Sequence, residues 1–331
     1  MDVAIVGCGL SGAYIAHRLR QTHPGLSMTI YECHAHRVGG RLLSVPAGVA
    51  SGDGPQFVEE FGGMRIFPQV HTRMALVVEE LELELVARPL SEEANFYFDA
   101  GTQPQRKVPT SSIGSNAFDT LMDRHDVLHP GDKDKPLYEQ ALHSMSVQNC
   151  WETYSSGDEA GRKAWYSQLG YDGVGGISAA CWRQVNSCLA EAGPTHHYQL
   201  QEGWTNVVKK LYDNTPVVFN RQLVEIEAGV RGSILHFTNG STMRARSVFL
   251  TMPLCKWPAI TGLAPGIAVR ANASVINAQC TKTFLTFEKA WWTDDFGLTT
   301  GRSITTTRAR MVFYVSAAAA CCATAAIEGP S

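Results

Sequence analysis

Hydrophobic and polar residues alternate in a recognisable order over the first thirty-two positions. The β-prone run Val3 to Val6 leads into the turn Gly7-Cys8-Gly9-Leu10-Ser11-Gly12, and Ala13 to Arg20 then contains neither Gly nor Pro. A second β-prone run, Met28 to Tyr31, ends at the acidic residue Glu32. This order predicts a strand, a glycine turn, a helix and a second strand. We therefore expect the chain to begin with a doubly wound α/β unit.

The spacing of the glycines in this turn is typical of dinucleotide binding. Gly7 permits the tight bend, Gly9 lets the backbone approach a pyrophosphate, and Gly12 lets the helix lie close to the strand. The free N–H groups at the start of the helix favour negative charge. Glu32 follows Gly12 by 20 residues, the distance at which a carboxylate meets the ribose hydroxyls and disfavours a 2′-phosphate. NAD or FAD is expected, and NADP is not.

Further elements are predicted along the rest of the chain. Met74, Val78, Leu81 and Leu85 have the spacing of an amphipathic helix. Short strands are expected at 94–100 and 311–315, and turn-rich breaks at 130–136 and 170–176. Residues 217–226 are β-rich, Asn239-Gly240 predicts a hairpin between 233–238 and 241–246, and 247–253 is typical of a buried parallel strand ended by proline.

Composition narrows the class of protein. The 331 residues, 36.1 kDa, suggest about two domains. A net charge of −3 without a basic block argues against nucleic-acid binding. The nine cysteines form no CxxC pair, and no basic, cleavable leader precedes Val3, so we expect a cytosolic protein. The apolar run 311–327 is only 17 residues long and mostly alanine, so no membrane span is expected.

Two further glycine-rich segments carry a family resemblance. Val38-Gly39-Gly40-Arg41 follows Glu32, and Glu60-Phe61-Gly62-Gly63-Met64-Arg65-Ile66 comes next. In these segments the chain resembles the flavin-containing amine oxidase family, whose Gly-Gly-Arg contacts the cofactor phosphates and whose second turn passes beside the isoalloxazine ring. Gly-x-Met-Arg resembles the L-amino-acid oxidase branch and implies that Arg65 binds a substrate carboxylate through its planar fork. The alternative for Arg65 is a structural salt bridge.

A later stretch strengthens the resemblance. Thr281 to Trp292 is similar to the family's lysine-bearing strand and the aromatic pair after it, which implies that Lys282 holds a water at flavin N5. The residue matching Leu223 binds adenine through its backbone in this family. The resemblance thus implies FAD, bound by Gly7, Gly9, Leu10, Ser11, Gly12, Glu32, Cys33, Gly40, Arg41, Gly62, Gly63, Met64, Arg65 and Leu223.

Histidines do not change this picture. His34 and His36 flank one residue, and His196 and His197 are adjacent, but neither pair has a third ligand within reach in the sequence. Flavin oxidases of this kind need no metal, and we predict none here.

The resemblance also implies a division of the chain. Residues 1–65 and 198–258 are expected to form a discontinuous, Rossmann-like FAD-binding domain, with 66–197 as an inserted substrate and helical region. Residues 259–316 are expected to supply strands of the α+β substrate domain, and 317–331 a low-complexity tail. The family's last flavin segment, a glycine-rich helix facing the pyrimidine edge of the ring, is absent, so the chain is expected to be truncated at its C-terminus.

The implied activity is the oxidative deamination of a primary amine, best an L-amino acid, to an imine and then a 2-oxo acid with ammonia. Oxygen would be the acceptor and hydrogen peroxide the product. Lys282 and Arg65 would be the residues at the reacting centre, and no general base is identified. Two alternatives remain open: a polyamine or monoamine oxidase, and a catalytically silent flavin-binding relative. The oligomeric state is not predicted.

Overall fold

The fold is described by a computed structural model. It covers residues 1–46, 58–87, 95–98, 108–109, 142–154, 175–184, 198–264, 266–275, 281–285, 287, 289–297, 300–305, 307 and 311–315. The predicted turn at 130–136 and most of the one at 170–176 lie outside these residues.

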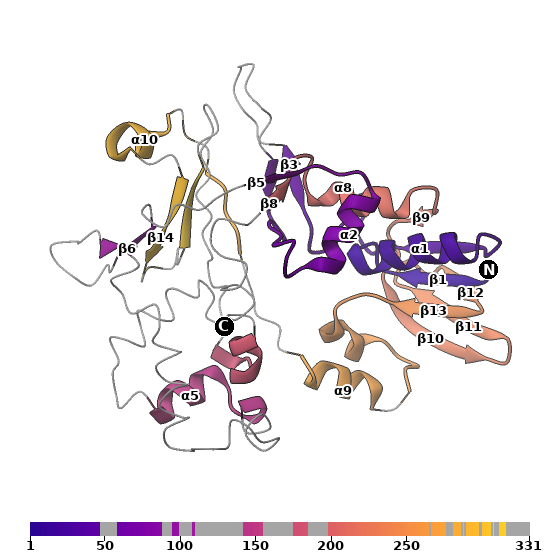
Figure 1. The fold of residues 1–331 in the computed structure, drawn as a ribbon. Helices are drawn as coiled ribbons and strands as arrows, with labels where there is room; N and C mark the ends of the chain where they lie inside the picture. Colours follow the sequence, from indigo (N-terminus) through magenta and orange to yellow (C-terminus); the bar gives the residue numbers. More distant parts are fainter. Residues whose placement is uncertain are drawn as a thin grey trace.

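A four-stranded parallel sheet forms the centre of the N-terminal unit (Figure 1). Its order is β13-β1-β2-β9, built from β1 (Val3–Val6), β2 (Met28–Tyr31), β9 (Val217–Val218) and β13 (Ser247–Leu250). Helix α1 (Leu10–Thr22) joins β1 to β2. The predicted strand–turn–helix–strand unit is confirmed. The prediction that β13 is buried is wrong, because it is an edge strand with alternating exposed and partly exposed residues.

Both faces of this sheet are covered, which explains why β1 is hydrophobic throughout. Val3 and Ile5 pack in one core cluster with residues of α1 and of helix α8 (Trp204–Tyr212). Ala4 and Val6 belong to a second cluster that includes Leu235 and Phe237 of a separate β-meander. The sheet is therefore a middle layer between helices and a second sheet.

The meander is antiparallel and consists of β10 (Leu223–Gly229), β11 (Gly232–Phe237) and β12 (Thr242–Ala245). Gly240, at φ +80°, lies in the predicted hairpin turn, which is confirmed. The single β-rich run predicted over 217–226 is instead two strands in different sheets. The chain turns between them at Asn220, whose φ of +53° is left-handed.

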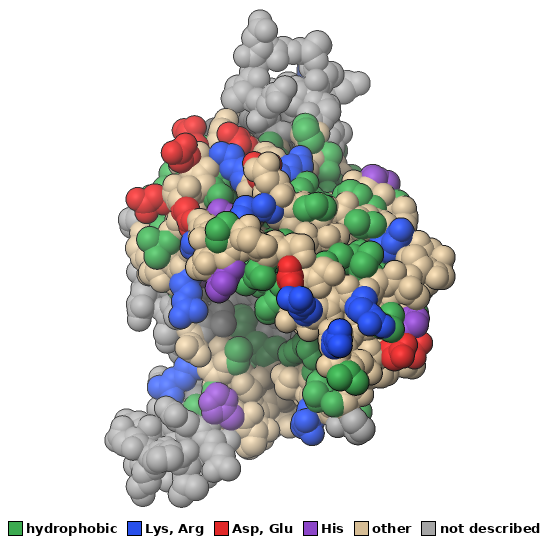
Figure 2. Space-filling view, turned by 90° about the vertical axis from the view of Figure 1, so that its right-hand side faces the viewer, with side chains coloured by type: hydrophobic (Ala, Val, Ile, Leu, Met, Phe, Trp, Pro, Cys, Tyr) green, Lys and Arg blue, Asp and Glu red, His purple; other side chains and the backbone are tan. Residues whose placement is uncertain are grey.

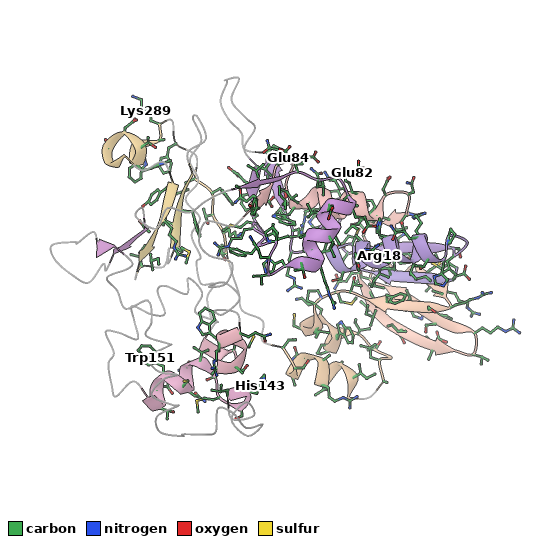
Figure 3. The ribbon with its side chains drawn as sticks, viewed as in Figure 1. Arg18, Glu82, Glu84, His143, Trp151 and Lys289 are labelled. Carbon is green, nitrogen blue, oxygen red and sulfur yellow. The ribbon has the colours of Figure 1, made fainter. Side chains whose placement is uncertain are left out.

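Helix α2 (Thr72–Glu80) is shorter than its predicted stripe, because Leu85 belongs to a strand instead. That strand, β5 (Leu85–Ala87), pairs antiparallel with β8 (Tyr198–Leu200). Helices α1 and α2 are linked at the surface where Arg18 Nη2 donates to Glu80 Oε2 at 2.9 Å, and Arg18 is labelled in Figure 3. Surface ion pairs of this kind add little stability.

A third sheet has the order β15-β14-β6-β7. It combines β6 (Asn95–Phe98) and β7 (Val108–Pro109) with β14 (Thr300–Thr305) and β15 (Met311–Val315), so it spans two units of the predicted domain division, which stays a prediction. The strands expected near 94–100 and at 311–315 are confirmed. Residues 281–285, predicted to be a strand, form none.

The remaining elements are short. They are β3 (Ser44–Pro46), β4 (Val58–Glu60), α5 (Val147–Tyr154), the 3₁₀ helix η5 (Leu254–Ala259), α9 (Ile267–Ala273) and α10 (Trp291–Phe296). Figure 2 shows the face that includes the N-terminal unit, with hydrophobic side chains inside a hollow and Lys and Arg side chains around it. Among the described residues, none of the helices has the length and apolar character to span a bilayer.

Candidate functional site

The first glycine turn is fixed by its own backbone. Gly7 has a φ of +107°, and its N–H donates to the carbonyl of Tyr31 at 2.8 Å. A Cβ on Gly12 would lie 2.0 Å from the carbonyl oxygen of Gly7, far inside van der Waals contact. Gly7 and Gly12 are therefore required by the fold itself.

Gly9 differs from its neighbours in this respect. Its backbone is extended, at φ −86°, and an added Cβ would meet nothing closer than 3.8 Å. Neither strain nor internal packing demands glycine at this position. The absence of a side chain there instead leaves the backbone open to close approach by a ligand, as the sequence predicted.

Helix α1 begins directly behind this opening. It starts at Leu10 with no side-chain cap and no acidic residue in its first turn, and Ser11 is exposed. The first N–H groups of a helix have no partners within the helix, and its dipole favours negative charge there. An anionic group in front of Gly9 would meet donors that the protein leaves uncapped.

Glu32 is buried beside the turn. Its Oε2 accepts the N–H of Cys8 at 2.8 Å, and its Oε1 accepts the N–H of His34 at 2.9 Å and the thiol of Cys33 at 3.2 Å. Burial and the Glu32 carboxylate raise the pKa of Cys8 to about 12, so this thiol stays protonated. The carboxylate is thus held in a set position, and its remaining lone pairs suit hydroxyl donors.

The chain just before Leu223 is hydrogen-bonded to the backbone of the Glu32 segment. The N–H of Arg221 donates to the carbonyl of Glu32 at 2.9 Å, and that of Asn220 to the carbonyl of His34 at 3.1 Å. Leu223 is buried at the start of β10, where the register shifts before Glu225. The segment that carries Leu223 is therefore held against the segment that carries Glu32.

The second glycine pair packs directly on the first turn. The N–H of Gly39 donates to the carbonyl of Cys8 at 2.8 Å, and a Cβ on Gly40 would lie 3.2 Å from the Cα of Gly9. Arg41, which is exposed, accepts the N–H of Gly63 on its carbonyl at 3.1 Å. The second glycine-rich segment therefore contacts both the first, at Cys8, and the third, at Gly63.

The third glycine-rich segment begins at Glu60, a buried carboxylate for which the sequence predicted no role. Glu60 Oε1 accepts the N–H of Trp204 at 2.8 Å, and both its oxygens accept the hydroxyl of Ser44, at 2.9 and 2.8 Å. The Ser44 Oγ in turn accepts the N–H of Thr205 at 2.9 Å. Glu60 and Ser44 therefore cap the start of α8 from strands β3 and β4.

Burial dominates the electrostatics of Glu60. It raises the pKa of this carboxyl to about 7, against the lowering effects of the Trp204 and Ser44 hydrogen bonds and of the nearby charge of Lys282. The carboxyl consequently changes its protonation state near neutral pH.

Lys282 reaches this segment from a distant part of the chain. Its Nζ donates to the carbonyl of Glu60 at 3.2 Å and to the carbonyl of Gly62. The predicted lysine and the predicted second turn are thus in direct contact, although 281–285 is not a strand. The aromatic pair after it divides, with Trp292 buried and Trp291 39% exposed.

Arg65 lies three residues after Gly62 and is half-buried. Its guanidinium carbon lies 5.9 Å from the ring centre of Phe67, and the charge of Arg65 acts on a second guanidinium, Arg302 of β14. Met64 beside it is also half-buried, and Gly63 is exposed. The turn therefore presents one positive charge next to the lysine contact.

Sequence reasoning missed three residues that matter here. Thr251 donates its hydroxyl to the carbonyls of Val6 at 2.9 Å and Gly7 at 3.0 Å, and it fixes the first turn from the end of β13. Glu60 stood inside the quoted motif, so its position before the glycines was an available signal. Arg302 had no local signal, because its surroundings arise only from packing.

The histidines singled out in the sequence do not gather further ligands in the described residues. The rings of His34 and His36 meet edge-on, with centroids 5.1 Å apart. Within the part of the chain that the structure describes, no group of three His, Cys, Asp or Glu side chains could hold a metal ion. His196 and His197 lie outside that part.

Comparisons with known proteins agree with this arrangement. The chain is 34% identical over 117 residues to an uncharacterised protein of Acanthamoeba polyphaga mimivirus, which covers 35% of this chain and 21% of that protein. It is 23% identical over 350 residues to aplysianin-A of Aplysia kurodai, covering 89% of this chain and 60% of that protein. The chain thus spans less than two thirds of the length of either relative.

Among solved structures, a variant of putrescine oxidase matches with a TM-score of 0.73 and 21% identity, covering 99% of this chain and 75% of that one. At this identity the match shows a shared fold. A family model described as flavin-containing amine oxidoreductase matches residues 10–330, nearly the whole chain. The chain therefore belongs to the flavin-containing amine oxidoreductase family.

Proposed function

We propose that this chain binds FAD and forms part of an amine oxidase that oxidatively deaminates a primary amine, best an L-amino acid, with oxygen as acceptor. The flavin of the family is the cofactor, and the residues present fit its dinucleotide part. The uncapped start of α1 and the open backbone at Gly9 suit the diphosphate, and buried Glu32 suits the ribose.

The contact between Lys282 and the glycine turn is the observation that carries the proposal. The ammonium donates to the carbonyls of Glu60 and Gly62, so a charged donor contacts the segment that the resemblance implies passes beside the ring. A lysine that only faced solvent would not be half-buried against two carbonyls.

The chemistry divides between cofactor and protein. When bound, the flavin would supply the acceptor for the hydride of the amine carbon, which carries both electrons of the oxidation. The protein residues bind and orient: Arg65 would hold the substrate carboxylate, and Lys282 would hold a water beside the ring. The product imine would hydrolyse to a 2-oxo acid and ammonia, and oxygen would take up the two electrons of the oxidation with two protons to give hydrogen peroxide.

Two alternative functions are compatible with the same fold. An oxidase of polyamines or monoamines would keep the same fold and leave Arg65 in a structural role. The likeness to putrescine oxidase supports the fold that both readings share. The other alternative is a relative that binds flavin without turnover. A cytosolic location remains a prediction from the sequence.

The absorbance of the purified chain between about 350 and 500 nm tests the proposal. FAD is added first, and a mixture of L-amino acids follows under anaerobic conditions. A flavin band that bleaches only with amino acids supports an L-amino-acid oxidase, and one that bleaches only with diamines or monoamines supports the first alternative. A stable band that never bleaches supports the silent relative, and absence of a band contradicts FAD binding by this chain.

Arg65→Lys tests the proposed carboxylate contact. Lysine keeps the charge but loses the planar fork, so KM for L-amino acids should rise roughly tenfold or more while KM for a simple amine stays unchanged. The exposed Arg73→Lys on α2 is the matched control and should change neither value. An unchanged KM for amino acids in Arg65→Lys would remove Arg65 from the site.

A further inference from the structure

Glu60 makes two sets of contacts through different parts of the same residue. Its buried carboxyl accepts the hydroxyl of Ser44 and the N–H of Trp204. Its main-chain carbonyl accepts from Lys282 Nζ at 3.2 Å. One residue therefore joins strand β3, the start of α8 and the segment 281–285.

The groups that bind the carboxyl are themselves held in place. The N–H of Ser44 donates to Thr205 Oγ1 at 2.8 Å, and the N–H of Thr205 donates back to Ser44 Oγ at 2.9 Å. A Cβ on Gly203 would lie 2.6 Å from the Cβ of Ser44, so the start of α8 packs closely on β3. Ser44 and Glu60 are also cross-strand partners. The Glu60 side chain thus ends in a rigid network.

The position of the Lys282 ammonium depends on the carbonyls that it contacts. A lysine side chain is long and flexible, so its head is fixed only where hydrogen bonds hold it. Besides Glu60, the carbonyl of Gly62 accepts from Nζ. The rings of Phe61 and Phe284, 4.6 Å apart at their centres, bring the two segments together beside this contact. The ammonium therefore lies where these two carbonyls are placed.

Charge acts in the same direction as the hydrogen bonds. Burial raises the pKa of Glu60 to about 7, and the nearby charge of Lys282 opposes this effect. When the carboxyl is ionised, it therefore attracts the ammonium that its own carbonyl binds.

We propose that Glu60 is a positioning residue for Lys282, because its anchored side chain holds in place the carbonyl that binds the ammonium. The proposal rests on the proposed function, in which Lys282 holds a water beside the flavin ring. Glu60 would act on the reaction through Lys282.

Chemical labelling of the cofactor-free chain tests this role without turnover. Trace acetylation with acetic anhydride at about pH 8, followed by mass spectrometry, gives the relative rate at each lysine. Lys282 should react about tenfold more slowly than exposed Lys256. Glu60→Ala should remove this protection. Glu60→Gln should keep part of it, because the amide can accept from Trp204 and donate to Ser44.

Lys210 is the internal control for this measurement. It lies at the other end of α8, where its Nζ donates to the carbonyl of Leu81 at 2.8 Å. Faster labelling of Lys282 in Glu60→Ala, with Lys210 labelling and α8 amide exchange unchanged, supports the proposal. Acceleration at both lysines would mark Glu60 as a support for α8 and overturn it, as would an unchanged rate at Lys282 or a Gln variant as reactive as Ala.

Ser44→Ala is the milder variant should Glu60→Ala fail to fold. It keeps the charge of Glu60 and removes the hydroxyl bound to its carboxyl, which is also the acceptor of the Thr205 N–H. Lys282 labelling should rise roughly threefold to tenfold. The wild-type rate at Lys282 in this variant would overturn the proposal.

Flavin reoxidation separates failure of this proposal from failure of the proposed function. Glu60→Ala should slow reoxidation, and Glu60→Ala combined with Lys282→Met should be no slower than Lys282→Met alone. Additive slowing would overturn the positioning role and keep the oxidase. A chain that shows the expected labelling but is reduced by no amine would contradict the oxidase and keep the contact between Glu60 and Lys282.

Discussion

The first and the last glycine-rich segments of the site are held in different ways. The turn from Gly7 to Gly12 is fixed mainly by backbone geometry, with a left-handed φ at Gly7 and a van der Waals limit at Gly12. The turn from Gly62 to Arg65 follows Glu60, whose carboxyl is bound by Ser44 and by the Trp204 N–H, and the carbonyls of Glu60 and Gly62 accept from Lys282. The turn from Gly7 to Gly12 therefore depends on the absence of side chains at its glycines. The turn from Gly62 to Arg65 depends on hydrogen bonds made by side chains.

This difference shows where each kind of change should act. Added atoms should damage the first turn, because its glycines leave no room. Altered charge or protonation should damage the second, because its shape depends on a buried carboxyl and an ammonium. The substitutions below test this contrast, beginning with the largest expected effect.

Gly12→Ala should be the most damaging of these changes. Its new Cβ would lie 2.0 Å from the carbonyl of Gly7, so the helix must move away from the strand. We expect a loss of about 3 kcal/mol or more in unfolding free energy and loss of FAD binding, measured by denaturant titration and flavin absorbance. Gly25→Ala, where nothing lies within 4 Å, is the control. Equal stability of both variants would contradict the close packing at Gly12.

Glu60→Gln should change how stability depends on pH. The folded pKa of about 7 lies above the ordinary 4.5, so the folded state binds a proton more tightly than the unfolded state between these values. The stabilisation is complete below pH 4.5 and is lost as pH rises through 7, by about 3 kcal/mol at most. Denaturant titrations across this range should show a flatter profile for Glu60→Gln than for wild type.

The exposed Glu225→Gln serves as the control for this profile, because it removes a carboxylate that lies in solvent. It should reproduce the wild-type slope. A Glu60→Gln profile parallel to wild type would show that Glu60 is not the titrating group.

Lys282→Met should weaken the second turn more selectively. The carbonyls of Glu60 and Gly62 lose a charged donor, which corresponds to about 2 kcal/mol of unfolding free energy. Under the proposed function, reoxidation of the reduced flavin by oxygen should also slow, as followed by stopped-flow absorbance. Exposed Lys256→Met should alter neither property. Normal reoxidation in Lys282→Met would separate this lysine from the oxygen reaction.

Thr251→Val should have the smallest effect. It removes a hydroxyl that donates to the carbonyls of Val6 and Gly7, while the Thr251 N–H still donates to Val6 at 3.0 Å. The expected cost is about 1 kcal/mol with a modest fall in FAD affinity, and Thr251→Ser should restore both. A larger loss than in Lys282→Met would show that the first turn also depends on side chains.

The contrast also explains how far the sequence could be interpreted. The strands, helix and acid around the first turn were predictable, because glycine spacing and hydrophobic runs report local backbone constraints. The hairpin at Asn239-Gly240 was predictable for the same reason. The interruption at Asn220 was missed, although asparagine is enriched in the left-handed region, because the β-prone residues on both sides of it were taken as one run.

The second turn was located from a resemblance, and its support came from packing. No local pattern connects Glu60 to Trp204, since these residues meet only after distant segments assemble. The exposed edge position of β13 was likewise set by sheet order, which a hydrophobic run of four residues does not specify. Long-range contacts therefore account for most of what was missed.

The parallel pairing of β1 with β13 affects how the protein folds during translation. The ribosome makes β1 before β13, and the hydroxyl that holds the turn after β1 belongs to a residue 245 positions later. During translation the edge of β1 that pairs with β13 must therefore stay unpaired until the intervening residues have been made. Such long-range closure slows folding and exposes a hydrophobic edge to aggregation. The nascent chain should accordingly depend on chaperones until β13 arrives, however stable the finished sheet.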